Sequence, residues 1–196
     1  MAQITIAVEG TDDAEAARRL CLVTHHEAGP VFIKYGKSKL DPCLGGYNEA
    51  ARHSPWLVLR DLDRDAPCAP TLVNALIASP AVGMCIRIPT PCLESWFLAD
   101  RGALAQFLSI PATRITRNPD ALEDAKLEMV NLARRSRSVS VRADMVPVAG
   151  LSSKVGPAYS GRMIEFASNH WDPDRAARSS QSLARCLAAL RALPAV

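Results

Sequence analysis

Carboxylates follow several apolar segments of this 196-residue chain, close to the points where those segments end. The run "WLVLRDLDRD" ends in Asp61, Asp63 and Asp65, the run "QITIAVEG" leads to Glu9, and Glu94 follows the run "VGMCIRI". Carboxylates about 4 Å apart repel one another, and burial raises that cost, so several at one site need a divalent cation or a proton. Oxygen ligands of this kind suit Mg²⁺ or Mn²⁺.

Each of these acids also has a purely structural interpretation. Asp12 and Asp13 stand at the expected start of a helix, where capping and the helix dipole favour them, and aspartates are common in turns after strands. Asp65 is either a third ligand or a solvated turn residue. Glu94 is either a ligand of a second metal or a carboxylate in the first turn of a helix. The sequence leaves both pairs of alternatives open.

Alternating strands and helices are expected to bring the acids to one edge. The expected strands are Gln3–Val8, Pro30–Tyr35, Trp56–Leu59 and Val82–Ile88. The expected helices are Thr11–Val23, Tyr47–His53, Pro70–Ala78 and Leu93–Leu108, the last as one helix or as two around Gly102, with a polar loop over Gly36–Gly46. Such alternation predicts parallel strands joined by helical crossovers, an α/β sheet of four strands in the Rossmann-like class with helices on both faces. Ligands of such sheets bind at the carboxyl ends of the strands.

The second half of the chain is predicted to be mainly helical. Helices are expected at Pro119–Arg135, Gly161–Asn169 and Pro173–Leu193, with a basic, serine-rich loop over Arg134–Arg142. No internal repeat or long linker is present. We therefore predict one domain over residues 1–196, in which an α/β core (1–108) carries a helical C-terminal extension (109–196) packed on it.

Composition and charge are those of an ordinary globular chain, with 48% hydrophobic residues, 22% charged residues and a net charge of +3. Mild basicity permits a nucleic-acid partner without demanding one. We expect neither a signal peptide nor a transmembrane helix, because the N-terminus lacks a basic n-region and no apolar run reaches about 18 residues. The six cysteines form no CxxC pair, so we expect reduced thiols in a cytoplasmic protein, with a zinc site of pooled ligands as the alternative.

The order of these motifs resembles the Toprim fold, the metal-binding catalytic module of topoisomerases, bacterial primases and OLD-family nucleases. Its signature is a glutamate after the first strand, matched by Glu9, and a DxD after the third, matched by Asp61 and Asp63. The chain resembles more closely the small stand-alone Toprim-like bacterial proteins of uncharacterised function related to those nucleases and to RloB. That likeness is carried by residues 93–100 ("LESWFLAD"), Tyr159, 165–166 ("EF"), 171–173 ("WDP") and 182–183 ("SL").

The resemblance implies phosphodiester chemistry that depends on Mg²⁺ or Mn²⁺. Glu9, Asp61 and Asp63 would be catalytic and would bind the metal, Glu9 as a ligand or as the general base, with Asp65 and Glu94 as further ligands. It also implies a nuclease or nuclease subunit that acts beside an ATPase partner, in phage defence or nucleic-acid processing. The chain carries no DNA-gripping domain, so strand passage and primer synthesis are not expected.

Candidate nucleic-acid-binding residues are Arg64, Arg134, Arg135, Arg137 and Lys154. The arginine run from 134 to 137 is alternatively a solvated face of the protein. Two other functions stay open. One is a non-catalytic Toprim-like module that binds metal, nucleic acid or a protein. The other is a phosphatase whose DxD motif supplies an aspartyl nucleophile, although such enzymes usually place that motif after their first strand.

Overall fold

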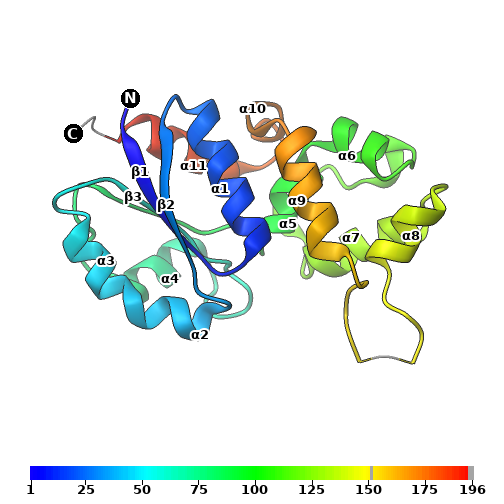
Figure 1. Ribbon diagram of the computed structural model, residues 1–196, viewed down its shortest axis with the longest axis horizontal. Helices are drawn as coiled ribbons and strands as arrows, with labels where there is room; N and C mark the ends of the chain where they lie inside the picture. The colour runs from blue at the N-terminus through cyan, green and yellow to red at the C-terminus, as the bar shows by residue number, and fades with distance from the viewer. Residues whose placement is uncertain (151, 194–196) are drawn as a thin grey trace.

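A sheet of four parallel strands forms the centre of the computed structural model, which describes residues 1–150 and 152–193 (Figure 1). The strands are β1 (Gln3–Val8), β2 (Glu27–Ile33), β3 (Trp56–Leu59) and β4 (Met84–Arg87), in the order β2-β1-β3-β4. Thr5 of β1 pairs with Trp56, and Trp56 pairs with Met84. The predicted α/β class, with a parallel sheet and a helical C-terminal half, is confirmed.

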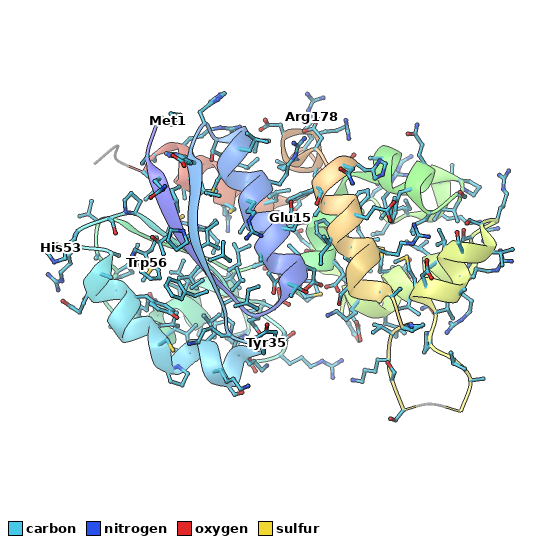
Figure 2. All side chains as sticks on the ribbon, viewed as in Figure 1. Met1, Glu15, Tyr35, His53, Trp56 and Arg178 are labelled. Atoms are coloured by element: carbon cyan, nitrogen blue, oxygen red, sulfur yellow. The ribbon has the colours of Figure 1, made fainter. Side chains whose placement is uncertain are left out.

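Two apolar layers cover the sheet, because alternate residues of each strand face opposite sides. On one side α1 (Thr11–Val23) and α11 (Gln181–Arg191) cover the layer that holds Ile6 and Leu57, and α5 (Leu93–Ala99) and α9 (Tyr159–Asn169) extend the same core, with α9 packed on α1. On the other side Ala7 and Val58 pack under α2 (Lys37–Leu40), α3 (Leu44–Ala50) and α4 (Ala69–Leu76). Trp56, labelled in Figure 2, stacks on the α3 residue Tyr47 at 4.6 Å between ring centroids. Cover on both faces explains why the strands are almost wholly apolar.

Helix α5 joins the sheet to the C-terminal helices, and every one of its residues is buried. Trp96 donates its indole N–H to Ser182 Oγ at 2.7 Å, and Trp171 donates to the backbone oxygen of Trp96 at 3.2 Å. Asp100, directly after α5, accepts two guanidinium bonds from Arg175 at 2.6 Å and one from the backbone N–H of Asp172 at 3.0 Å. The "LESWFLAD" segment is therefore bonded to the later "WDP" and "SL" segments.

The helical extension contains more and shorter helices than predicted. Besides α9 and α11 it holds α7 (Ala125–Arg134), α8 (Val139–Met145), α10 (Pro173–Ala176) and 3₁₀ turns at Ala112–Arg114 and Pro119–Ala121, and α6 (Arg101–Phe107) directly precedes it. Asp124, Ser138 and Ser180 each accept a backbone N–H three residues ahead and so begin α7, α8 and α11. These caps divide the expected helices over 119–135 and 173–193, and they turn part of the expected loop over 134–142 into helix.

Three segments of the core also differ from prediction. Strand β2 begins at Glu27, earlier than Pro30, and it runs through the proline because β2 is an edge strand where the lost donor is tolerated. The expected loop over 36–46 is mostly helical, with α2, a 3₁₀ turn at Asp41–Cys43 and the start of α3. The expected helix over 93–108 divides at Asp100 into α5 and α6.

The lengths of the helices and the state of the cysteines bear on two further expectations, that no helix spans a membrane and that the thiols are reduced. Over residues 1–150 and 152–193 the structure contains no helix long and apolar enough to cross a membrane. All six cysteines lie within these residues, and none is bonded to another. The expectation of free thiols therefore agrees with the structure.

Candidate functional site

The switch point of the sheet brings Glu9 and Asp61 together. Strands β2 and β3 lie on opposite sides of β1, and the connections that lead to them pass over opposite faces of the sheet, which leaves a crevice at the carboxyl ends of β1 and β3. Glu9 follows β1 and Asp61 lies two residues after β3. The backbone N–H of Asp61 donates to Glu9 Oε1 at 3.2 Å. The convergence expected of these two acids is therefore present.

The first turns of α1 and α5 complete the floor of the crevice. The backbone N–H of Leu93, at the start of α5, donates to Asp61 Oδ1 at 3.0 Å and holds that carboxylate in place. Asp13, in the first turn of α1, is 8% exposed and accepts the backbone N–H of Gly10 at 2.7 Å. Asp13 therefore caps its helix, as one of the structural interpretations predicted, and it also stands beside Asp61.

Burial of these carboxylates disfavours their charged forms. Burial, reinforced by the nearby charges of Asp13, Glu94 and Glu9, raises the pKa of Asp61 well above its ordinary value. Burial and the neighbouring Asp12 raise the pKa of Asp13 to about 7. The pKa of Glu9 is also raised by burial, against the lowering effect of Arg60. The crevice therefore favours either bound protons or a bound cation.

The helical extension closes one side of the site. Glu94 is only 2% exposed, and its Oε1 accepts the Tyr159 hydroxyl at 3.1 Å and faces Lys126 Nζ at 3.2 Å. Lys126 comes from α7 and Tyr159 from α9. Sequence reasoning did not single out Lys126, and no spacing links it to Glu94. Tyr159 entered only through the family resemblance.

Asp63 and Asp65 line the outer rim of the crevice, where cations of the protein bond them. Lys37 Nζ is 2.9 Å from Asp63 and 2.7 Å from Asp65, and Arg60 bonds Asp65 at 2.6 Å. Asp63 has a left-handed backbone (φ 50°) and a side chain that is 43% exposed. Arg60, which is 3% exposed, also bonds Asp41 at 3.2 Å and lies 3.7 Å from Glu9. Asp65 is thus an ion-paired residue at the rim of the crevice and not a free turn residue.

The carboxylates of the crevice are the possible ligands of a divalent cation. In the part of the chain that the structure describes, no group of three or more histidine, cysteine, aspartate or glutamate side chains is arranged around one ion position. Mg²⁺, however, is usually held by one or two carboxylates, with waters and substrate phosphates completing the shell. Glu9 and Asp61 provide that pair and only oxygen donors. Glu9 and Asp61 therefore fit a divalent-cation site that a substrate phosphate would complete. Asp63, Asp65 and Glu94 remain predicted ligands, and their oxygens already contact lysine or arginine side chains.

A cavity of about 760 Å³ opens in front of Asp61, and Arg64, Lys126 and Lys154 line it. Two of the candidate nucleic-acid-binding residues, Arg64 and Lys154, are therefore at the site. The other three, Arg134, Arg135 and Arg137, lie at and beyond the far end of α7, roughly 12 Å along the helix axis from Lys126. Tyr35, labelled in Figure 2, marks the end of β2 at the same edge of the sheet.

Comparison of the chain with models of protein families, with curated proteins and with solved structures found no match in any of the three. The likeness to Toprim proteins therefore stays an expectation drawn from the sequence motifs. The fold and the crevice between β1 and β3 carry the functional argument.

Proposed function

We propose that this protein hydrolyses phosphodiester bonds with the help of Mg²⁺ or Mn²⁺, as a Toprim-like nuclease or nuclease subunit. One observation carries the proposal: Glu9 accepts the backbone N–H of Asp61 at the switch point of a parallel sheet, and burial raises the pKa of both carboxyl groups. A divalent cation and a substrate phosphate would complete such a pair. A cytoplasmic role beside an ATPase partner, in phage defence or nucleic-acid processing, belongs to the same proposal and rests on the sequence resemblance alone.

The residues around the crevice have distinct roles in this proposal. Glu9 and Asp61 would hold the cation, which supplies charge stabilisation at a phosphate oxygen and a more acidic water. The Leu93 N–H fixes the orientation of Asp61. Asp13, with a pKa of about 7, can accept or release a proton near neutral pH. Lys126 stands beside the buried carboxylates as the nearest cation that could face developing negative charge.

Hydrolysis assays with matched variants test the proposal. We expect Mn²⁺- or Mg²⁺-dependent hydrolysis of bis(p-nitrophenyl) phosphate, and a fall of about 100-fold or more in Glu9→Gln and Asp61→Asn. Calorimetry should show Mn²⁺ binding to the wild type that is lost in both variants. Glu123→Gln is the control, because Glu123 lines the same cavity and is exposed. Activity in the two variants equal to that of the control would refute the assignment of the site.

A non-catalytic binding module is the second candidate, and one observation favours it. Cations of the protein already contact the outer carboxylates: Lys37 contacts Asp63 and Asp65, and Lys126 contacts Glu94. Such a module would bind Mn²⁺ or nucleic acid without turnover under any metal. A phosphatase with Asp61 as its nucleophile is disfavoured, because Asp61 follows the third strand, whereas such enzymes usually place their DxD motif after the first. The phosphatase reading predicts a phosphoenzyme that can be trapped and that Asp61→Asn abolishes.

A further inference from the structure

A second hollow lies along β4, the edge strand of the sheet farthest from β2. It has a volume of about 580 Å³, and its apolar wall includes Met84, Ile86 and Ile88. Two guanidinium groups reach it, from Arg87 on β4 and Arg185 on α11. This volume falls in the range of pockets that hold one drug-sized or nucleotide-sized unit.

This hollow is continuous with the crevice that holds Asp61. A cavity of about 620 Å³ lies between them and shares residues with both. Asp63, Arg64 and Pro91 also line the cavity of the crevice. Leu62, Pro67 and Thr90 also line the hollow along β4. We call the three joined cavities the β4 trough.

The charges along the β4 trough suit a chain of phosphates. Within the described residues, Arg64, Arg87 and Arg185 have no carboxylate within 4 Å, so no ion pair holds these three arginines. Carboxylates also line the trough near Arg64: Asp63, which is paired with Lys37, and the exposed Glu123. Arg87 donates its Nε only to Cys85 Sγ, at 3.3 Å. Asp120 lines the same hollow, but its two oxygens accept bonds from Ser180 Oγ at 2.7 Å and the Ser182 N–H at 2.9 Å.

We propose that the β4 trough holds one strand of nucleic acid that leads away from the Glu9–Asp61 pair. Arg64 would contact a phosphate near the carboxylates, and Arg87 and Arg185 would contact phosphates farther along the strand. The apolar wall of β4 suits the face of a base or sugar, and guanidinium groups suit phosphate. A single strand fits these hollows because each has room for a nucleotide-sized unit. This inference rests on the proposed function and specifies its substrate.

Binding of labelled oligonucleotides in EDTA tests the β4 trough without hydrolysis. The probes are 5′-fluorescein dT₁₂ and rU₁₂, with anisotropy measured over a series of KCl concentrations. For the double variant Arg87→Gln/Arg185→Gln we expect the salt slope to fall by about 1.4, because each phosphate contact on a single strand contributes about 0.7. Affinity at 0.1 M salt should then fall about 25-fold. The control Arg134→Gln/Arg135→Gln removes two exposed arginines outside the trough and should change affinity less than about twofold.

Single variants and the hydrolysis assay keep the possible results separate. Arg185 is exposed on α11, so Arg185→Gln should fold normally and weaken binding by about fivefold. Equal losses in the two double variants, or no binding of either probe to the wild type, would overturn the trough. Wild-type hydrolysis of bis(p-nitrophenyl) phosphate without oligonucleotide binding would leave the proposed function standing. Oligonucleotide binding that depends on Arg87 and Arg185, without hydrolysis under any metal, would support the trough and remove the catalytic proposal.

Discussion

The substitution Asp13→Asn should stabilise this protein at high pH and leave its stability at low pH nearly unchanged. Burial and the charge of Asp12 raise the pKa of Asp13 from an ordinary 3.8 to about 7. Between these two values the folded protein holds a proton that the unfolded chain has lost. The free energy of unfolding therefore falls as the pH rises from about 4 to about 7, and it levels off above that.

The pKa of Asp13 sets the size of the effect. The difference between 3.8 and about 7, at about 1.36 kcal/mol for each pKa unit, corresponds to about 4 kcal/mol. The charges of Asp12, Glu94 and Glu9 contribute to the raised pKa of Asp13, so part of the effect depends on them, and we expect a gain of about 2–4 kcal/mol at pH 8. The amide oxygen of the new asparagine can still accept the Gly10 N–H, which preserves the helix cap.

Urea unfolding in EDTA, followed by tryptophan fluorescence and far-UV circular dichroism at pH 4, 6 and 8, measures this gain. The midpoint of Asp13→Asn should exceed that of the wild type by about 1–2 M at pH 8, for a slope of about 2 kcal/mol per molar urea. Glu123→Gln changes an exposed carboxylate and should stay within about 0.5 kcal/mol of the wild type at each pH. Destabilisation of Asp13→Asn at pH 8, or a gain of the same size at pH 4 and pH 8, would refute the reasoning.

Four further substitutions test packing and pairing in the fold by urea unfolding. Lys126→Met removes the cation beside the buried Glu94 carboxylate and should cost about 1–3 kcal/mol of unfolding free energy at pH 8. The cost should be smaller at pH 5, because Asp13, with a pKa of about 7, is then protonated and the site carries less negative charge. An equal cost at both pH values would contradict a charge effect. Asp100→Ala deprives a backbone N–H and a half-exposed arginine of their acceptor and should cost about 2 kcal/mol, whereas an unchanged midpoint would mean that the α5–α10 link is not stabilising. Gly83→Ala places a methyl group 2.4 Å from a backbone oxygen at the end of α3 and should destabilise the protein strongly. Gly102→Ala, in open space within α6, should stabilise it by about 0.5–1 kcal/mol. A Gly83→Ala protein more stable than Gly102→Ala would contradict this packing.

Strands β1 and β3 have the residue bounds predicted from the sequence, because their apolar, β-branched runs end abruptly at charged residues. The divisions of the later helices were not predicted, although Ser138 and Ser180 are residue types that commonly cap helices. Ser138 lies in a stretch expected to be a loop and Ser180 lies inside an expected helix, and only the hydrogen bond of each cap shows where a new helix begins. Strand β2 was placed late because a proline inside a strand is acceptable only at an edge, and edge position depends on the whole sheet.

For the site too, only the features that follow from local patterns in the sequence could be predicted. The meeting of Glu9 with Asp61 could be predicted, since both follow parallel strands. The positions of Asp63 and Asp65 could not, because the chain turns through a left-handed residue and the ion pairs with Lys37 form across 26 residues of sequence or more. Lys126 reaches the site only through the docking of α7, which no local pattern encodes.

The complete burial of α5 has a consequence for the folding of this protein during its synthesis on the ribosome. Trp96 and Phe97 have no solvent contact in the finished fold, yet the Trp171 side chain that packs against them is made more than 70 residues later. At 5–20 residues per second, a nascent chain would carry an uncovered aromatic helix for roughly 4–14 s. We therefore expect chains truncated before Trp171 to be captured by chaperones that recognise apolar segments, or to aggregate.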